Sequence, residues 1–251
     1  MVRVLAVSDE IVDSLLLGAA AEMRPDLILA AGDLPFDYLE SLMISCNAPL
    51  AYVPGNHDPD LSGYRRGRTG WTRAGMPASD PGPLGAIALD GRVRTVAGLR
   101  IAGLGGSIRY SDGPNQYRES AMRIRAARLA VRVLAARFIR PGRTGERMRS
   151  HVHAIDVLLT HSPARGFGDA PDPAHRGFAC FVGLVRALTP QVLIHGHIHP
   201  HGRPAAERAI SWRRARGNAE STPCINTVGY CLFEIDPGGD SLAIMRRRRG
   251  T

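Results

Sequence analysis

The feature that most constrains the fold of this chain is a repeated pattern in which a short apolar run ends in polar side chains able to bind a metal. The segments with this form are Ser8-Asp9, Gly32-Asp33, Gly55-Asn56-His57-Asp58, Thr160-His161 and Gly196-His197-Ile198-His199. In open α/β sheets, ligand sites collect beyond the carboxyl ends of the strands, so residues far apart in sequence can converge there. The pattern therefore predicts an α/β fold with one site shared by several strand ends.

The first half of the chain alternates apolar runs with amphipathic segments, which is typical of strand-helix-strand units around a largely parallel sheet. We expect strands at 2–7, 26–31, 49–53, 99–104, 155–159 and 191–194, and helices at 11–23, 36–45, 117–138 and 178–188. The apolar runs on either side of Asp90-Gly91 predict a β-hairpin. Two closing strands are expected near 223–235 and 241–245.

The segment 117–138 carries apolar residues at helical spacing, which predicts one buried stripe. The stripe consists of Tyr117, Ala121, Ile124, Val131, Leu134 and Phe138, and another face carries Arg118, Arg125 and Arg132. We interpret these arginines as a solvated face rather than a phosphate-binding one, because arginine is an ordinary helix former.

Length and composition favour one domain. The 251 residues, 44% of them hydrophobic, suffice for one sizeable core, so we expect a single domain over 1–251. Gly, Pro and Arg predict surface loops at 59–85, 140–150 and 200–222, and 246–251 is expected to be a basic tail. No apolar run approaches the roughly 20 residues that span a bilayer, so we expect a soluble, cytoplasmic protein with no membrane partner.

The net charge of +9 would suit a partner that carries phosphates, such as nucleic acid. However, all 32 basic residues are arginine, and they are spread through the chain with few aromatic residues among them to stack on bases. This skew is more typical of codon bias in a GC-rich genome than of a binding surface. Nucleic acid is therefore a less favoured partner than a small phosphoester.

Each polar segment also has an ordinary structural explanation. Gly32-Asp33 and Gly55-Asn56 could form turns, and His161 alone could be a hydrogen-bonded structural histidine. The alternating series His195, His197, His199 and His201 favours metal binding, because four histidines on one face of a strand would serve no packing purpose.

Taken together and in this order, the segments resemble the calcineurin-like metallophosphoesterase superfamily. Its signature is Asp-x-His, Gly-Asp, Gly-Asn-His-Asp/Glu, a later His, and Gly-His-x-His. Similarity at 105–110, 161–169 and 172–178 extends the resemblance to a branch of small single-domain phosphoesterases, over residues 2 to about 235. The resemblance implies a four-layer α-β-β-α sandwich, in which two mixed sheets are flanked by helices. It also implies a phosphodiesterase or phosphatase acting on a small molecule or nucleotide.

The resemblance further implies two divalent metal ions, such as manganese, iron or zinc. Asp33 would bridge them, Asp9 and His199 would complete one site, and Asn56, His161 and His197 the other. A metal-bridging hydroxide would attack the phosphorus. His57 is left free to assist the leaving oxygen. Asp58 could orient the His57 ring or be structural, and Arg109 is a weaker candidate for binding the phosphate.

The chain departs from the signature at its first motif, where Asp9-Glu10-Ile11 replaces Asp-x-His. Because an aliphatic side chain cannot bind metal, one site loses a ligand, and we expect it to bind its ion more weakly. Three protein ligands plus solvent still form a workable catalytic site. Glu10 or Asp13 could compensate, and the sequence leaves both open.

Two alternatives to a small-molecule phosphoesterase follow from the same residues. A nuclease acting on DNA is favoured by the basic balance and by similarity of the motif set to that of repair exonucleases. A catalytically weak, metal-binding scaffold is favoured only by the missing histidine at position 11, whereas His57 and the six expected ligands favour an enzyme.

Overall fold

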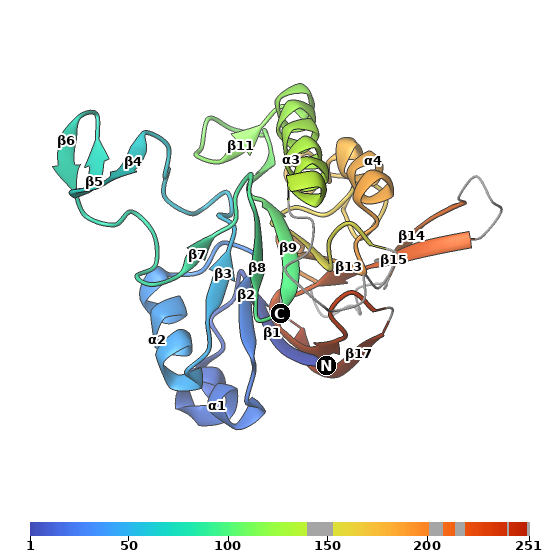
Figure 1. Ribbon diagram of the computed structural model, residues 1–251, viewed down its shortest axis with the longest axis horizontal. Helices are drawn as coiled ribbons and strands as arrows, with labels where there is room; N and C mark the ends of the chain where they lie inside the picture. The colour runs from blue at the N-terminus through green and yellow to red at the C-terminus, as the bar shows by residue number, and fades with distance from the viewer. Residues whose placement is uncertain (140–152, 201–207, 214–218, 240, 250–251) are drawn as a thin grey trace.

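The computed structural model describes residues 1–139, 153–200, 208–213, 219–239 and 241–249 (Figure 1). Its main body contains two six-stranded mixed sheets. The first sheet has the order β17 (Leu242–Arg249), β16 (Gly229–Ile235), β1 (Val2–Ser8), β2 (Leu27–Ala30), β3 (Leu50–Tyr52) and β7 (Ile87–Ala88). The second has the order β14 (Arg208–Arg213), β15 (Ala219–Asn226), β13 (Val192–His195), β12 (Val157–Thr160), β9 (Leu99–Leu104) and β8 (Val93–Val96).

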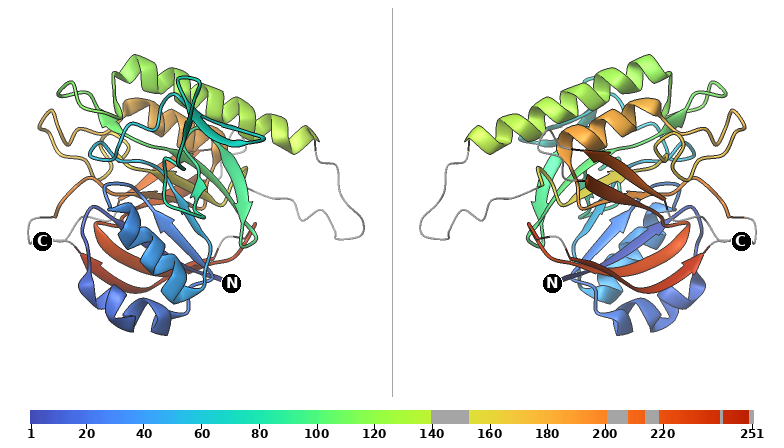
Figure 2. Two further views of the ribbon diagram at one scale, coloured as in Figure 1. Left: turned by 90° about the vertical axis from the view of Figure 1, so that its left-hand side faces the viewer. Right: turned by 90° about the vertical axis from the view of Figure 1, so that its right-hand side faces the viewer.

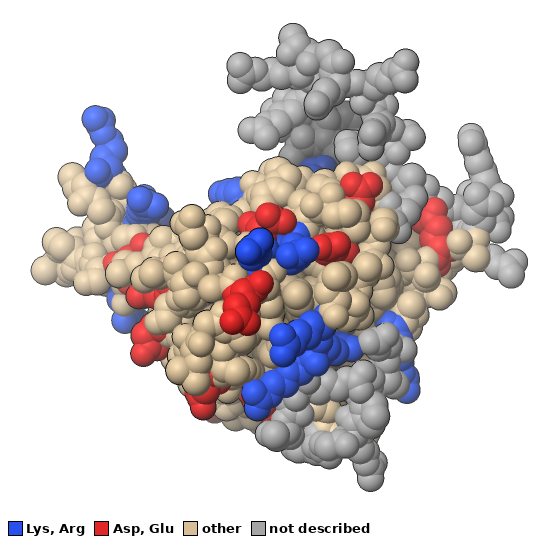
Figure 3. Space-filling view, turned by 90° about the horizontal axis from the view of Figure 1, so that it is seen from below, with Lys and Arg blue, Asp and Glu red and all other residues tan. Residues whose placement is uncertain are grey.

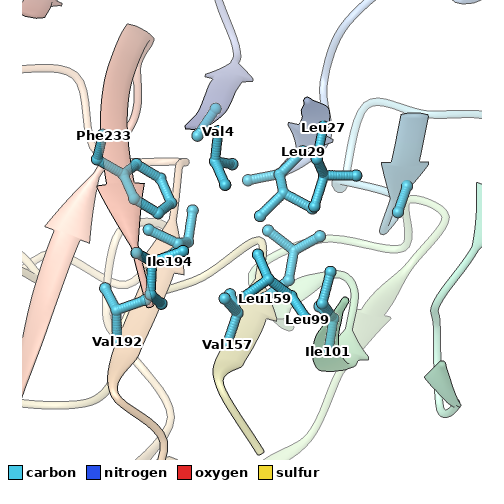
Figure 4. Close-up of a cluster of buried hydrophobic side chains, with 14 of the residues drawn as sticks. Val4, Leu27, Leu29, Leu99, Ile101, Val157, Leu159, Val192, Ile194 and Phe233 are labelled. Atoms are coloured by element: carbon cyan, nitrogen blue, oxygen red, sulfur yellow. The ribbon is translucent and has the colours of Figure 1, made fainter. Parts of the chain in front are cut away.

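Helices cover the outer face of each sheet (Figures 1 and 2). The π-helical turn η1 (Leu15–Ala19), α1 (Ala20–Met23) and α2 (Phe36–Cys46) pack on the first sheet, and α3 (Glu119–Ile139) and α4 (Ala179–Leu188) on the second. A third cluster of buried side chains fills the space between the sheets (Figure 4). These layers confirm the predicted α-β-β-α sandwich.

Strand β1 shows how the sequence produces these layers. Successive side chains of a strand point to opposite faces. Val4 and Ala6 accordingly lie in the core between the sheets, whereas Leu5 and Val7 pack against the helices. A strand buried on both faces has a continuous apolar sequence rather than an alternating one, as β1 does.

The central strands of both sheets are parallel, and this aligns their carboxyl ends. In the first sheet β1, β2, β3 and β7 run parallel to one another. β16 is antiparallel to β1, and the edge strand β17 is antiparallel to β16. In the second sheet β9, β12, β13 and β15 run parallel, flanked by antiparallel β8 and β14. The polar segments singled out in the sequence therefore follow neighbouring strands.

The predicted hairpin at Asp90-Gly91 is wrong. β7 pairs with β3 in the first sheet, whereas β8 pairs with β9 in the second, so the chain crosses between sheets here. The hairpin turn is instead at Ala97-Gly98, where both residues have positive φ, 48° and 83°. Two such residues are what a type I′ turn between antiparallel strands requires.

The predicted first helix, 11–23, is shorter than expected. Regular helix spans only Ala20–Met23, and the preceding turn is π-helical. Gly18 has a φ of 109°, outside the helical range, and thereby interrupts the segment.

The apolar stripe predicted on α3 is also wrong. The buried residues are Met122, Ala126, Leu129 and Val133, whereas Ile124, Val131 and Leu134 are exposed. Small Ala126 faces inward, where α3 contacts α4 and the second sheet. Hydrophobicity alone favoured the larger side chains of the wrong face.

Three predicted loops and tails contain strands. Within 59–85 the chain forms a three-stranded antiparallel sheet of β4 (Tyr64–Gly67), β5 (Gly70–Arg73) and β6 (Met76–Ala78). Within 200–222 lie β14 and the start of β15, and most of the expected basic tail belongs to β17. The single strand expected at 223–235 is two, because β15 and β16 belong to different sheets. The expected loop at 140–150 lies outside the described residues.

The remaining strands, β10 (Ser107–Ile108) and β11 (Gln116–Tyr117), form a small parallel pair. Of the helices that the structure describes, none combines the length and the apolar character needed to cross a membrane.

The two faces of α3 can be distinguished by mutation. Leu129 is 0% exposed and Val131 is 66% exposed. We expect Leu129→Ala to lower the free energy of unfolding by about 2–5 kcal/mol, because it leaves a cavity. Val131→Ala should change it by less than about 0.5 kcal/mol. Urea denaturation measures both changes. Equal losses of stability would contradict the burial of Leu129 and support the buried face predicted from the sequence.

Candidate metal centre

Both sheets contribute side chains to the same edge of the sandwich. Asp9 follows β1, Asp33 follows β2, and Asn56 follows β3 in the first sheet. His161 and His197 follow β12 and β13 in the second. Because the sheets are packed face to face, carboxylates and an amide from one meet imidazoles from the other.

The described residues include one group of acidic and histidine side chains able to hold a metal ion. One ligand atom from each of Asp9, Asp33, His161 and His197 lies within 4.8 Å of the others. His161 Nε2 lies 3.3 Å from Asp33 Oδ2 and 2.9 Å from Asn56 Oδ1. The structure thus brings together five of the six predicted ligands.

A backbone carbonyl accepts a hydrogen bond from one ring nitrogen of each histidine. His161 Nδ1 lies 2.7 Å from Ala31 O, and His197 Nε2 lies 2.8 Å from Ala174 O. A carbonyl only accepts hydrogen bonds, so each of these nitrogens carries a hydrogen. The other nitrogen of the His197 ring, Nδ1, then presents its lone pair, which is the usual arrangement of a metal-binding histidine. His161 Nε2 lies against the acceptor oxygens of Asn56 and Asp33, so it carries a hydrogen that a bound metal would displace.

The electrostatics of the cluster favour a positive charge at its centre. Burial alone lowers the pKa of His161, but the carboxylates of Asp33 and Asp9 raise it to about 9. Burial likewise opposes ionisation of Asp33, but the charge of His161 and hydrogen bonds hold the Asp33 pKa below its usual value. Burial, with the charge of His161, lowers the pKa of His197 to about 3, so this ring is neutral.

The backbone bends sharply at three of the cluster residues. Asp9, Asp33 and His197 have φ of 60°, 57° and 68°, a left-handed conformation that costs a non-glycine residue of order 1–3 kcal/mol. Backbone hydrogen bonds fix the two carboxylates in this conformation. His197 N donates to Asp9 Oδ2 at 2.9 Å, and His57 N donates to Asp33 Oδ1 at 2.8 Å.

Two glycines leave room for these carboxylates. A Cβ at Gly55 would lie 2.0 Å from Asp33 Oδ1, and one at Gly196 would lie 2.3 Å from Asp9 Oδ2. Real Cβ atoms do not approach other atoms so closely. The glycines of the Gly-Asn-His-Asp and Gly-His-x-His segments therefore serve close packing of the carboxylates.

Asp58 has a structural role. Its Oδ2 accepts hydrogen bonds from Gly55 N at 2.7 Å and from Asp33 N at 3.0 Å. These bonds tie the end of β3 to the end of β2. Of the two roles open in the sequence, the structure shows this one, whereas the ring of His57 is exposed.

His199 lies next to the residue that precedes the missing ligand. His199 Nδ1 is 3.1 Å from Glu10 Oε1, and both side chains are partly buried. Ile11 is 51% exposed, and Asp13 is also exposed.

Of the alternating histidines, only His195 belongs to β13, and the chain leaves the strand before His197 and His199. The strand ends at His195, which is buried, and burial lowers its pKa to about 4. His197 then takes its left-handed turn, so the alternating histidines do not share one strand face. His201 lies outside the described residues.

Tyr110 and Arg125 support the site and were missed in the sequence. Asn56 Nδ2 donates to Tyr110 Oη at 3.1 Å, which directs the amide oxygen toward His161. Arg125 binds both carboxylate oxygens of Asp90, at 2.6 and 2.5 Å, and donates to Gly105 O at 3.2 Å. It thereby secures the start of the loop that carries Tyr110.

Arg125 is therefore only partly solvated, contrary to our interpretation of the arginine face of α3. Its guanidinium also stacks on Tyr117, 4.1 Å from the ring centroid. Arg132, on the same face, donates to Gly91 O. Arg109 is paired with Asp112, so a phosphate would compete with that carboxylate for its guanidinium.

Comparison with known families identifies the fold and its chemistry. The sequence profile described as calcineurin-like phosphoesterase matches residues 6–201. The chain belongs to this family. Calcineurin-like phosphoesterases are metal-dependent hydrolases of phosphoesters that use two metal ions, and this chain supplies a group of aspartates and histidines able to bind metal.

Solved structures share the fold. The crystal structure of TT1561 of Thermus thermophilus has 14% sequence identity and a TM-score of 0.54, with 98% of this chain and 99% of that chain covered. Another crystal structure has 15% identity and a TM-score of 0.58 over the same shares. The search of curated proteins returned no match.

A glycine substitution tests the close packing at Asp33. We expect Gly55→Ala to lower the free energy of unfolding by about 1–3 kcal/mol, because its Cβ displaces a buried carboxylate. Gly183→Ala is the matched control: Gly183 is exposed on α4, and its added Cβ meets nothing within 4 Å. The control should stabilise the protein by roughly 0.5–1 kcal/mol. Similar effects of the two changes in thermal denaturation would contradict the packing argument.

Proposed function

We propose that this protein hydrolyses a phosphoester of a small molecule or nucleotide, as a phosphodiesterase or phosphatase that depends on two divalent cations. The observation that carries the proposal is the cluster of Asp9, Asp33, His161 and His197, in which both histidines are buried and a backbone carbonyl accepts a hydrogen bond from one nitrogen of each ring. Such a cluster serves no packing purpose, and its mixed N/O donors suit manganese, iron, zinc or a similar ion.

The proposed ligand sets follow from this arrangement. Asp33 would bridge the cations, because its carboxylate lies between His57 N, which donates to it, and the ring of His161 in the other sheet. Asn56, His161 and His197 would complete one site, and Asp9 with His199 the other. Bound cations would offset the negative charge of a phosphate and lower the pKa of water at the site.

His57 is the proposed catalytic residue. Its backbone is fixed by the hydrogen bond to Asp33, while its ring is exposed beside the cluster and makes no hydrogen bond within the described residues. In the reaction, a water loses one proton to solvent, its oxygen bonds to phosphorus, and the bond from phosphorus to the leaving oxygen breaks. That oxygen takes a proton, and the donor is later protonated again from solvent. The His57 ring would be this donor. An exposed ring that makes no hydrogen bond within the described residues favours an enzyme over a scaffold, because it has no evident structural role.

Removal of the His57 ring separates catalysis from metal binding. We expect His57→Ala to lower kcat for an aryl phosphodiester by about 10²- to 10⁴-fold, which is the usual contribution of a general acid. Metal affinity measured by calorimetry should stay unchanged, because His57 is not a proposed ligand. Unchanged kcat would remove His57 from the mechanism, and absence of any metal-dependent turnover by the wild type would overturn the proposed function.

Glu10 is positioned to compensate in part for Ile11. A carboxylate that accepts a hydrogen bond from His199 Nδ1 holds the ring so that Nε2 can face a metal. Asp13 has no comparable position, since its side chain is exposed. We therefore propose that Glu10 orients His199 and that the Asp9 and His199 site remains the weaker of the two.

Metal titration tests both statements. We expect two unequal binding steps in the wild type, and Glu10→Ala should weaken one of them by about 10- to 100-fold, which is typical for loss of a residue that orients a ligand. Asp13→Ala, the matched control, should change neither step. In a His199→Ala background Glu10→Ala should have no further effect. An additional loss there would instead make Glu10 a ligand itself.

A further inference from the structure

The sheet formed by β4, β5 and β6, which we call the arm (residues 64–78), projects from the two main sheets (Figure 1). None of its residues is buried. Small sheets normally gain stability by packing a hydrophobic face against another element. The arm lacks such packing, because none of its residues is buried, and both of its faces lie at the surface.

One face of the arm combines aromatic rings with arginines. Residues directly opposite each other in paired strands lie on the same face. Arg73 lies opposite Tyr64 and Met76, and Arg66 lies opposite Trp71. We call this set of five residues the aromatic face. The guanidinium of Arg73 stands 4.9 Å from the centroid of the Tyr64 ring, and Tyr64 and Trp71 are both partly exposed.

The arm is also strongly basic. It carries Arg65, Arg66, Arg68 and Arg73 and has no acidic residue. No ion pair involving these four arginines occurs in the part of the chain that the structure describes. Seen from below, blue side chains stand out from the projection on the left, with red side chains nearer its base (Figure 3). Arg73 has an acidic neighbour, Asp60, whose pKa is lowered by hydrogen bonds from Ser62 and by the charge of Arg73. The arm thus offers positive charge, chiefly from Arg65, Arg66 and Arg68, beside two aromatic rings.

The arm leaves the chain next to the metal centre. Tyr64 follows His57 by seven residues, which span at most roughly 25 Å when fully extended. The base of the arm is anchored, because Asn115 Nδ2 donates to Asp58 O at 3.1 Å. A ligand that binds the arm can therefore reach the site if it is about seven nucleotides long, taking 3.4 Å for each.

These features favour one occupant. A second copy of the arm would place arginines against arginines, which is unfavourable. Single-stranded nucleic acid has the complementary charge, and its bases stack on aromatic rings flanked by arginine. Accepting the proposed phosphoester hydrolysis, we propose that the arm binds single-stranded nucleic acid and that the substrate is its phosphodiester backbone. This replaces the small phosphoester that composition alone favoured, because the arm places arginines and aromatic rings together on one face. Hydrolysis would add water across one P–O bond and leave one phosphate end and one hydroxyl end.

Binding can be measured without hydrolysis. In the presence of a chelator, fluorescence anisotropy of a labelled oligothymidylate of about twelve nucleotides should show binding that weakens steeply between roughly 50 and 200 mM salt. Trp71→Ala should weaken binding by about 5- to 150-fold, the usual loss for one stacked base, and Trp71→Phe should largely restore it. Arg66→Ala should lower the salt slope by about 0.7.

Arg128→Ala is the matched charge control, since Arg128 is exposed on α3, away from the arm. It should leave binding nearly unchanged, and an equal effect of Arg128→Ala and Arg66→Ala would reduce the interaction to net charge. Tighter binding to duplex DNA, or to vesicles of phosphatidylcholine and phosphatidylserine, would also overturn the proposal.

The arm proposal and the proposed function can fail separately in these experiments. Trp71→Ala should still hydrolyse an aryl phosphodiester, because that substrate is too small to reach the arm. If the wild type hydrolyses the aryl ester but does not bind the oligonucleotide, the arm proposal fails and the enzyme assignment stands. If it binds the oligonucleotide but hydrolyses nothing with any divalent ion, the proposed function fails.

Discussion

The structure depends on the face-to-face packing of two sheets whose parallel strands end at the same edge. Val4, Leu29, Val157 and Ile194 are among the side chains that fill the space between the sheets. This core sets the carboxylates that follow β1 and β2 opposite the histidines that follow β12 and β13. The group of side chains that could hold a metal ion takes two members from each sheet. The hydrophobic contact between the layers therefore determines the geometry of the polar site.

The cluster is costly without a cation. Two buried carboxylates at close range repel each other, and burial penalises each charge. In the structure a proton on His161 partly relieves this repulsion, which is why the pKa of that histidine is raised although it is buried. Left-handed backbone at Asp9, Asp33 and His197 adds strain of the kind that concentrates at functional sites. The free energy of binding divalent cations would offset both the repulsion between the carboxylates and the backbone strain.

The sequence predicted which polar side chains lie together better than it predicted the elements around them. Asp33, Asn56 and His161 were recognisable because each ends an apolar run, and a strand end is a local feature. The hairpin signal of Asp90-Gly91 failed because the Asp90 carboxylate is used elsewhere, by Gly105 N and Arg125. The inward face of α3 depends on how closely a helix approaches its neighbours, which composition does not reveal. Tyr110 and Glu10 have their roles only through contacts across the fold.

The central claim is that Asp33 and its neighbours from both sheets hold two cations. Crystals grown with manganese should show two peaks in the anomalous difference map, about 3.5–4 Å apart, with Asp33 between them. The peak beside Asp9 and His199 should have the lower occupancy. Peaks remote from the cluster, or their absence from it, would contradict the account.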